Sequence, residues 1–468
     1  MCLFTMNKKI TILGAGISGL TTAYLLQKKG FDVTVIEKNN QPGGAMESVH
    51  EQGFLFDRGP NSLLETVPLI GQLVTELGLE SEMIYANEEG NKRYILRNNQ
   101  LHALPTSLKG FLQTKLFSVA AKFRLLKEPF VGRSNDGYYQ SIADFVKRRL
   151  GQEFLDYAIN PFVAGVYAGR PEKLSVASAF PKLYALEEKY GGLMIGAFKS
   201  AKERKKRAEV SKQSAKMLSF RNGMQTLPLA LAKYLGNHVL TDSEIISVEK
   251  SSDDKFIVTY MTDGKKYTLV SDAVLSTIPP YGINKLLSKF DASIDAVFSK
   301  IEYPPVLVCY LVYPKEVIGQ PLDGFGFLIP EKEKKSFLGA VWSSVIFTNR
   351  SDTQHAAFTL FVGGMRNPEI IKEDREKLFA RVQEEFESIM KISGKPVFKT
   401  TRFWAKAIPQ YNLGYVETEK YFDTFEANNP GIFLSGNYRG GVSVGDCIKN
   451  AEPTAEKIEK YFDDLMMQ

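Results

Sequence analysis

Cysteine is scarce in this sequence, and the chemistries that depend on it are correspondingly excluded. Only three cysteines occur among 468 residues: Cys2, Cys309 and Cys447. They are far apart and form no CxxC or His-x-Cys spacing. Because disulfide frameworks and zinc sites need closely patterned ligands, we expect neither, and we predict no metal-ligating residues.

Long apolar runs and targeting signals are also missing. No run approaches the ~20 residues that a membrane-spanning helix needs. The opening MCLFTMNKK has neither the apolar core nor the small-residue cleavage site of a signal peptide. We therefore expect the protein to remain in the compartment that makes it.

Histidine and nucleic-acid motifs are equally rare. The four histidines, His50, His102, His238 and His355, lie in no pattern that suggests a general base. We therefore predict no catalytic side chain. The basic segments at 105–130 and 197–217 contain no nucleic-acid recognition motif, which argues against nucleic acid as a partner.

The overall composition is that of a folded protein with more than one domain. Hydrophobic residues make up 44 % of the chain and charged residues 24 %, which is ordinary for globular proteins. Single cores rarely grow beyond ~250 to 300 residues. A chain of 468 residues should therefore hold two or three domains.

The segment KKITILGAGISGLTTAYLLQKKGFDVTVIEK has the pattern of a dinucleotide-binding unit. An apolar strand leads into Gly14, Gly16 and Gly19, followed by a helix, a second strand and Glu37. Gly14 permits a tight turn, Gly16 lets the backbone approach a diphosphate, and Gly19 lets helix and strand pack closely. The helix N-terminus would receive the phosphates, and Glu37 would accept hydrogen bonds from ribose hydroxyls.

Two later glycine-rich segments favour FAD over NAD. Gly43-Gly44-Ala45 follows the acidic strand and precedes FLFDRGPNS, so a second loop can close over the diphosphate of a longer dinucleotide. Near the other end, a short strand GIFLSG is followed by GNYRGGVSVGD and a helix beginning at about 442–444. Its N–H groups would stabilise negative charge on a reduced flavin.

Strands and helices alternate between these ends. Residues 92–104 predict two strands joined at Asn98-Asn99, and 106–216 are mostly helical, with an N-cap candidate at Ser141. Residues 238–278 predict a meander of strands, which would give the adenine a main-chain partner near Val248. Residues 298–404 predict further strands and one long helix at 373–390.

Two basic segments raise the question of a membrane surface. From Pro105 to Phe130, six apolar residues fall at helical spacing and four lysines interleave with them. This pattern fits a helix lying in an anionic headgroup layer or an ordinary surface helix packed on its own domain. The segment 197–217 carries eight Lys and Arg against two Glu, and would be a solvated face or contact anionic lipid or a carboxylate-rich ligand. The apolar residues of the first segment are Leu108, Leu112, Leu116, Val119, Phe123 and Leu126, and its lysines are Lys109, Lys115, Lys122 and Lys127.

Several blocks together resemble the oxygen-dependent, FAD-containing protoporphyrinogen oxidases, nearly from end to end. Flavin amine oxidases and phytoene desaturases are similar at the two ends of the chain only. The matching blocks are GAGISGL, FDRGPNS, NKRYILRN with HALPTSL, NPFVAGVYAGRPEKLS, FRNGMQTLP, GFGFLIP, LFVGGMRN, RFWAKAIPQYNLGY and GNYRGGVSVGDCI.

The resemblance implies an α/β fold with a Rossmann-like FAD-binding domain of the flavin amine oxidase type. A substrate domain built on a mixed antiparallel sheet and a mostly helical, membrane-associating domain would complete it. We expect the FAD-binding domain in 1–90, 218–292 and 412–468, the substrate domain in 91–104 and 293–411, and the helical domain in 105–217.

The resemblance also implies a reaction. Six electrons leave a porphyrinogen in three two-electron steps, each passing hydride to FAD, and molecular oxygen reoxidises the flavin to give hydrogen peroxide. The family further suggests a homodimer. With no targeting segment in view, we expect a bacterial cytoplasmic enzyme attached peripherally to the inner face of the membrane.

By resemblance, Arg93 would hold a substrate propionate, and Gly165 would face the macrocycle. Leu328 and Phe361 would clamp pyrrole rings, and Tyr167 would narrow the pocket or bind a carboxylate. Trp404 and Gln410-Tyr411 should adjoin the flavin. The family commonly has Gly-His where this chain has Gly414-Tyr415, so no histidine role transfers. The candidate FAD-binding residues are Gly14, Gly16, Ser18, Gly19, Glu37, Lys38, Gly43, Gly44, Ala45, Gly59, Pro60, Asn61, Val248, Trp404, Gly436, Val442, Ser443 and Val444.

Three alternatives stay open from the sequence. Near relatives oxidise coproporphyrinogen, whose four propionates need more cations or solvent at the pocket mouth. A flavin amine oxidase would need an aromatic cage for a deprotonated amine. A flavin-bearing scaffold would bind tetrapyrroles without oxidising them.

Overall fold

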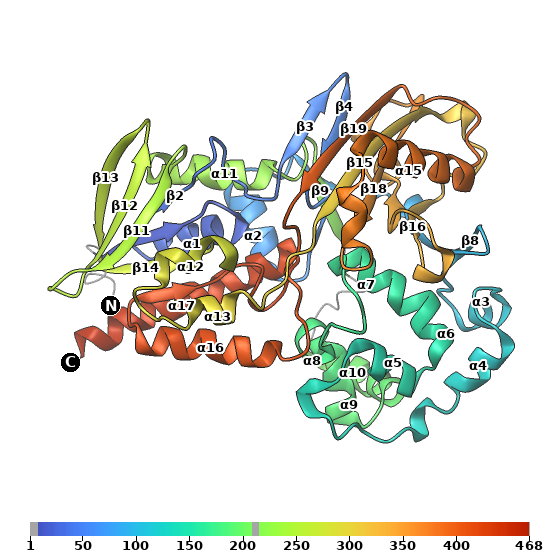
Figure 1. Cartoon of the computed structure of the whole chain (residues 1–468), viewed down its shortest axis with the longest axis horizontal. Coiled ribbons are helices and arrows are strands. Elements are labelled where there is room, and N and C mark those ends of the chain that lie inside the picture. The colour runs from blue at the N-terminus through green and yellow to red at the C-terminus, as the bar shows by residue number, and fades with distance from the viewer. Residues whose placement is uncertain (1–7, 208–214, 468) are drawn as a thin grey trace.

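The computed structural model describes residues 8–207 and 215–467. Its N-terminal unit is built on a five-stranded parallel sheet with strand order β10-β2-β1-β14-β20 (Figure 1). The first strands and their connecting helix fall where the glycine pattern predicts them, whereas β14 and β20 come from much later in the chain. The bounds are β1 Lys9–Leu13, α1 Ile17–Lys28, β2 Asp32–Ile36, β10 Val239–Leu240, β14 Ala273–Ser276 and β20 Ile432–Leu434.

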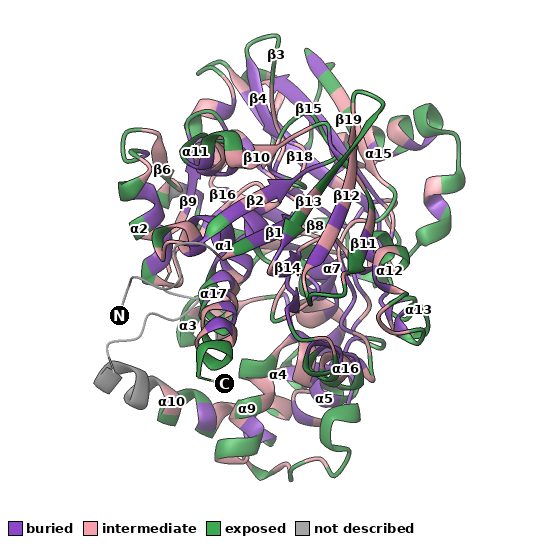
Figure 2. Ribbon diagram, turned by 90° about the vertical axis from the view of Figure 1, so that its left-hand side faces the viewer, coloured by how far each residue is buried: buried purple, intermediate pink, exposed green. Residues whose placement is uncertain are grey.

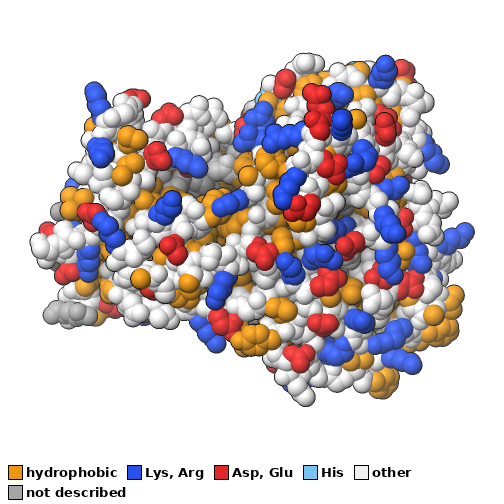
Figure 3. Space-filling view, in the orientation of Figure 1, with side chains coloured by type: hydrophobic (Ala, Val, Ile, Leu, Met, Phe, Trp, Pro, Cys, Tyr) orange, Lys and Arg blue, Asp and Glu red, His pale blue; other side chains and the backbone are white. Residues whose placement is uncertain are grey.

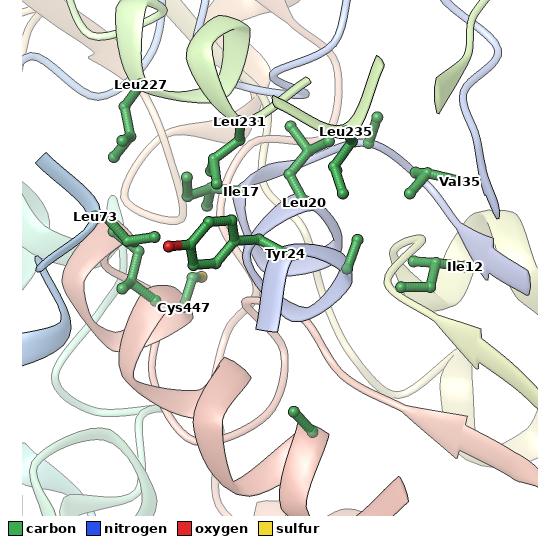
Figure 4. Close-up of a cluster of buried hydrophobic side chains, with 14 of the residues drawn as sticks. Ile12, Ile17, Leu20, Tyr24, Val35, Leu73, Leu227, Leu231, Leu235 and Cys447 are labelled. Atoms are coloured by element: carbon green, nitrogen blue, oxygen red, sulfur yellow. The ribbon is translucent and has the colours of Figure 1, made fainter. Parts of the chain in front are cut away.

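Helices from three parts of the chain pack around α1. Tyr24 is fully buried between α11 (Thr226–Leu235), α2 (Pro68–Glu76) and α17 (Val444–Met466), as Figure 4 shows through Leu231, Leu73 and Cys447. Buried apolar residues of β1 and β2 continue this core, and Figure 2 colours much of these strands as buried. The two ends of the chain therefore fold together, because each supplies a layer that the other buries.

A three-stranded antiparallel meander, in the order β11-β12-β13, lies on the other side of this sheet. Its second turn is at Asp263-Gly264, and both residues have positive φ, as the Asp-Gly signal predicts. The bounds are β11 Glu244–Lys250, β12 Phe256–Thr262 and β13 Lys265–Ser271. The helices beside it are α12 Pro280–Leu287, α13 Ile294–Phe298 and α16 Tyr415–Asn428.

A second, seven-stranded sheet has the order β19-β15-β18-β17-β16-β7-β8. The hairpin β7-β8 turns at Asn98 and Asn99, which both have positive φ, and it joins this sheet although it precedes the helical segment in sequence. α15 covers one face through Leu378, Val382 and Phe386. The bounds are β7 Lys92–Arg97, β8 Gln100–Ala103, β15 Val306–Pro314, β16 Gly324–Leu328, β17 Gly339–Val341, α14 Ser343–Ile346, β18 His355–Gly363, α15 Arg375–Met390 and β19 Phe398–Trp404.

Short strands connect the two sheets. β3 pairs with β4, and β9 pairs with both β5 and β6. Their bounds are β3 Ser48–Glu51, β4 Phe54–Asp57, β5 Leu63–Leu64, β6 Met83–Tyr85 and β9 Met217–Phe220.

Residues 105–207 form a helical unit below the seven-stranded sheet in Figure 1. Ser141 caps α5 as predicted, because its side chain accepts a hydrogen bond from the Asp144 N–H. A single turn of π-helix at Leu155–Ile159 precedes α7, where Pro161 lacks an N–H to donate. The helices are α3 Leu108–Gln113, α4 Val119–Leu125, α5 Ile142–Arg149, α6 Gln152–Phe154, α7 Asn160–Tyr167, α8 Val176–Ala179, α9 Pro181–Tyr190 and α10 Leu193–Arg207.

The helical spacing of 105–130 predicts one continuous helix, and the structure has two. Thr114 accepts from the Leu116 N–H and ends the first helix, and Ser118 caps the second by accepting from the Ala121 N–H. The basic segment 197–217 lies partly outside the described residues.

Candidate functional site

The glycine segments expected to bind the dinucleotide lie against one another. Gly43 donates its N–H to the Ala15 carbonyl at 2.8 Å and forms a bridge with Gly16. A Cβ at Gly44 would lie 3.3 Å from the Gly16 Cα. The loop after β2 thus closes directly over the turn before α1.

The cradle between these segments fits a diphosphate. A Cβ at Gly16 would meet nothing within 4 Å, so its backbone borders open space. α1 begins at this point without a side-chain cap, so its first N–H groups are available to an anion. Gly14 and Gly19 instead face Thr277. A Cβ at either glycine would lie within 3.1 Å of the Thr277 hydroxyl oxygen.

Glu37 lies at the end of β2 and is almost completely buried. Its carboxylate accepts from the Ala15 N–H at 2.9 Å and from the backbone and side chain of Asn39. Lys38, which follows it, is exposed. Glu37 therefore orients the glycine turn itself.

The chain passes Glu37 just before the meander begins at Glu244. Ser243 donates its N–H to the Glu37 carbonyl at 2.9 Å. Val248 lies five residues further on, opposite Val258, with a side chain that is only 1 % exposed. A main-chain contact of Val248 with the adenine stays a prediction.

The segment after β4 connects the glycine cradle to the seven-stranded sheet. A Cβ at Gly59 would lie 1.9 Å from the Ala45 carbonyl oxygen, so these two segments touch. Trp404 donates its indole N–H to the Arg58 carbonyl at 2.7 Å. Pro60 and Asn61 follow, and Asn61 lines a small cavity together with Phe325 and Thr359 of the sheet unit.

The C-terminal glycine loop is held by a pair of tyrosines. Tyr411 donates to the Asn437 carbonyl and accepts from the Gly441 N–H, and it stacks on Tyr415 with 4.3 Å between ring centroids. Tyr415 donates to the Tyr438 carbonyl. The tyrosine that replaces the family histidine thus supports this loop.

The loop then runs into α17 beside α1. Gly436 borders Thr277, Ser443 caps α17 through the Asp446 N–H, and Ser18 contacts the Cys447 thiol. Val442 is partly buried and Val444 is buried. Two helix N-termini therefore meet at the same cradle.

Strand register places four of the predicted residues on one face of the seven-stranded sheet. Phe361 pairs with Val308 on one side and with Gly339 on the other. Gly339 in turn pairs with Leu328, so Leu328 and Phe361 lie in the same row across the strands. The next row contains Arg93, opposite Gly326. Residues directly opposite, and those two positions along, point to the same face of a sheet, so Trp404 also lies there.

α7 packs over this face. A Cβ at Gly165 would lie 2.7 Å from a terminal methyl carbon of Leu328. Gly165 is exposed together with Phe162 and Val166, which share one side of the helix. Leu328 and Phe361 are half-buried, so the helix and the sheet present an open apolar surface.

Tyr167 lies on the opposite side of α7 from Gly165. It is 3 % exposed, and its hydroxyl donates to the Ala179 carbonyl at 3.0 Å. Burial raises the pKa of Tyr167 well above its ordinary value. The structure does not bring this hydroxyl to the apolar surface, because two helical positions correspond to about half a turn.

Sequence reasoning missed Phe162, Val166, Phe325 and Thr277. The first two could have been found from helical periodicity, since they share a side of α7 with Gly165. Phe325 lies under the guanidinium of Arg93, and the Arg93 Cζ is 5.4 Å from the centroid of the Phe325 ring. Thr277 is identified only by its contacts with distant glycines.

Comparisons with known proteins agree with this geometry. Residues 17–458 match the family model for flavin containing amine oxidoreductases. The chain belongs to this family. Its FAD cofactor and its flavin amine oxidase-type fold of mixed sheets and helices, both predicted from the sequence, are thereby confirmed, and it is an FAD-dependent oxidoreductase. Membrane association of the helical unit stays a prediction.

The relatives include two kinds of porphyrinogen oxidase. The chain is 32 % identical to protoporphyrinogen oxidase 2 of Arabidopsis thaliana, over 98 % of this chain and 95 % of the relative. It is 26 % identical to coproporphyrinogen III oxidase of Bacillus subtilis (strain 168), over 97 % of this chain and 98 % of the relative.

Solved structures share the fold. A crystal structure of a protein from Exiguobacterium sp. 255-15 has a TM-score of 0.78 at 23 % identity and covers 97 % of this chain and 98 % of its own. Putrescine oxidase bound to putrescine has a TM-score of 0.69 at 17 % identity and covers 97 % of this chain and 99 % of its own.

Proposed function

We propose that this protein oxidises protoporphyrinogen IX to protoporphyrin IX, with FAD as hydride acceptor and oxygen as final acceptor. Three oxygen molecules would take up the six electrons and six hydrogens and leave as hydrogen peroxide. The observation that carries the proposal is the single apolar surface formed by Gly165, Leu328 and Phe361, with Arg93 at one end and Trp404 at the other.

The residues of this chain would bind and orient the substrate. FAD, when bound, supplies the hydride-accepting chemistry. The half-buried leucine and phenylalanine would contact the faces of pyrrole rings and exclude water. Arg93 would hold a propionate through its planar fork, and so fix which carbon lies nearest the glycine cradle.

The charges around Arg93 favour a substrate with two propionates over one with four. Lys92 is paired with Asp323, Arg97 with Glu153, and Arg170 with Glu172 and Glu331. Arg93 has no ionic partner within the described residues. One free guanidinium would leave one propionate unpaired on a substrate with two and three on a substrate with four, so coproporphyrinogen III, named for a relative, is the second candidate.

Turnover of the two porphyrinogens tests the proposal. Each would be supplied at the same concentration, with porphyrin fluorescence and peroxide followed together. We expect faster turnover of protoporphyrinogen, with three peroxides per porphyrin formed. Faster turnover of coproporphyrinogen would assign the second candidate. Oxidation of an amine without oxidation of either porphyrinogen would contradict both.

The surface of α3 and α4 supports attachment to a membrane. Among the six apolar residues of the predicted pattern, only Leu116 is buried. The other five and Phe130 are 62 % to 89 % exposed, and Figure 3 shows hydrophobic side chains gathered at the lower right beside Lys and Arg. An exposed apolar patch flanked by lysines suits an anionic headgroup layer.

The attachment is peripheral in this proposal. None of the helices within 8–207 and 215–467 is long and apolar enough to cross a bilayer. The expected site is the cytoplasmic face, where anionic lipids attract the four lysines of this segment. A homodimer also remains a prediction.

Flotation with anionic vesicles tests the attachment. We expect the protein to float, and Leu112→Glu together with Phe123→Glu to abolish flotation. Tyr267→Glu, on the exposed side of β13, is the matched control and should leave it unchanged. A parent protein that stays wholly in the soluble fraction would contradict the attachment.

A further inference from the structure

Arg366 is a partly buried cation for which the proposed reaction has no direct use. It belongs to the turn 364–366, which follows β18. Its guanidinium donates to the Ile329 carbonyl at 2.6 Å, to the Asn160 carbonyl at 2.8 Å and to the Asn160 Oδ1 at 2.6 Å. Burial lowers the pKa of Arg366 to about 10, so it is charged at neutral pH.

Asn160 extends this network to the segment after β16. Its Oδ1 also accepts from the Glu331 N–H at 3.0 Å, and its side-chain N–H donates to the Glu331 carboxylate at 3.3 Å. Asn160 is the first residue of α7, and Ile329 directly follows Leu328. Arg366 therefore joins the start of α7 to the end of β16.

The same turn holds the other end of α7. Met365 donates its N–H to the Ala168 carbonyl at 2.7 Å. A Cβ at Gly364 would lie 2.5 Å from that carbonyl oxygen, so the two backbones are in close contact. Between these two attachments lies Gly165, which presses against Leu328.

We propose that Arg366 is a positioning residue that holds α7 against β16 and thereby fixes where Leu328 lies in the substrate surface. This inference rests on the proposed function, which puts the macrocycle at Gly165 and Leu328. A planar guanidinium bonded to three oxygens fixes a separation that apolar packing alone would leave adjustable. Arg366 would therefore affect substrate binding without touching the substrate.

Kinetics of Arg366→Met and Arg366→Lys test the role. We expect Arg366→Met to raise KM by about tenfold, because losing charge-assisted hydrogen bonds shifts α7, and to leave kcat within about threefold. Arg366→Lys should recover part of the affinity, since it keeps the charge but cannot bridge three oxygens. Arg381→Met, on α15 at the far face of the sheet, is the matched control and should have no effect.

The flavin separates this role from a general structural one. Absorbance and FAD content should be unchanged in Arg366→Met. Loss of FAD in proportion to loss of turnover, or an unchanged KM, would overturn the proposal. Should Arg366→Met not fold, the same measurements on Arg366→Lys decide.

A double-mutant cycle with Gly165→Ala gives a sharper test. In the parent, the added methyl would collide with Leu328. In the Arg366→Met background, α7 can withdraw, so the second substitution should raise KM by a smaller factor than it does alone. Strictly additive effects would overturn the proposal.

Hydrogen exchange tests, without any substrate, whether Arg366 holds α7 against β16; this attachment is called the clamp below. We expect amides of 160–168 to exchange faster in Arg366→Met than in the parent or in Arg381→Met. Unchanged exchange would overturn the clamp even if porphyrinogen turnover is confirmed. Faster exchange in a protein that oxidises no porphyrinogen would support the clamp and contradict the proposed function instead.

Discussion

Arg93 differs from the other cations of its neighbourhood in having an aromatic ring and no carboxylate beside it. Its guanidinium lies over Phe325, whereas the adjacent Lys92 is tied to Asp323. A cation–π contact orients a guanidinium while leaving its N–H groups free for an anion. Its N–H groups are thus available to a carboxylate from outside the protein, as the proposed function requires.

Replacing Arg93 with alanine should weaken substrate binding selectively. Loss of one charge-assisted contact costs ~1.5 to 3 kcal/mol, which corresponds to about tenfold or more in apparent affinity. The flavin spectrum should be unchanged. Measuring KM for protoporphyrinogen in the parent and the variant checks this prediction. Lys92→Ala is the control, and it should change KM by less than about twofold. An unchanged KM would remove Arg93 from the site.

Gly59 shows how tightly the flavin segments approach each other. Its φ is not positive, so the requirement for glycine comes from contact and not from backbone strain. Any side chain there would displace the Ala45 carbonyl and with it the Gly43-Gly44 turn.

We therefore predict that Gly59→Ala weakens FAD binding. Overpacking of this kind costs ~1 to 3 kcal/mol, and each 1.4 kcal/mol corresponds to about tenfold in affinity. The absorbance ratio of flavin to protein after dialysis measures the loss. Gly132→Ala, whose Cβ would meet nothing within 4 Å, should retain full flavin content. Equal flavin content in both variants would contradict the role of this contact.

Among secondary-structure elements, those with strong local signals could be predicted from the sequence. The hairpin β7-β8 follows from Asn98-Asn99, which tolerate positive φ, and α17 follows from the glycine loop before it. The continuous helix expected over 105–130 could not be rejected by periodicity. Its interruption depends on Ser118, whose N–H and hydroxyl both bind Glu153, 35 residues away.

The candidate site divides in the same way. The glycines and Glu37 are predictable because their spacing along the chain is itself the signal. Arg366 and Thr277 are not, because their partners are 37 to 264 residues away. Their roles arise only when strands and helices from distant segments are packed together.

The helices of the 105–207 unit are joined by a buried ionic network. Arg149 donates to the Glu128 carboxylate at 2.7 Å and also to Glu187, and all three side chains are at most 3 % exposed. Glu128 in turn accepts from the first N–H groups of α10. Burial would raise the pKa of Glu187, but hydrogen bonds from Arg149, the Ser134 N–H and Arg148 outweigh it and hold the pKa below its usual 4.5.

The stability that Glu187 contributes should therefore depend on pH. Because its folded pKa is lowered, the contribution is complete above about pH 4.5 and is lost as the pH falls below that value. Glu187→Gln should destabilise the protein by about 3 kcal/mol at pH 7, since it removes one of the two carboxylates bonded to buried Arg149 and the ionic partner of Arg148.

Thermal midpoints measured from pH 3 to 7 check this prediction. The difference between parent and Glu187→Gln should shrink below about pH 4.5, as the parent carboxylate becomes protonated. Glu188→Gln, exposed on the same helix, should match the parent throughout. A difference that is constant with pH would contradict the assigned cause.

At the scale of the whole molecule, the candidate flavin site lies where three distant parts of the chain meet. α1, the segment 43–61 and the start of α17 surround the same cradle. The buried pair Asp57–Arg350, at 3.0 Å, then connects that cradle to the seven-stranded sheet unit. A ligand in the cradle would thus contact all three segments at once.

Removal of FAD should for this reason destabilise the protein unevenly. A ligand present at about a thousand times its Kd adds ~4 kcal/mol to the stability of the folded state, so the apoprotein should unfold at a lower temperature. Amides of 14–20, 43–61 and 440–446 should exchange faster in the apoprotein, because the cradle loses the partner for its N–H groups. Those of α15 should not change, since this helix packs on the far face of the seven-stranded sheet.

Hydrogen exchange of apoprotein and reconstituted protein measures both regions at once. Uniform acceleration, including α15, would mean that FAD holds the entire fold together, and no acceleration at the cradle would place the cofactor elsewhere.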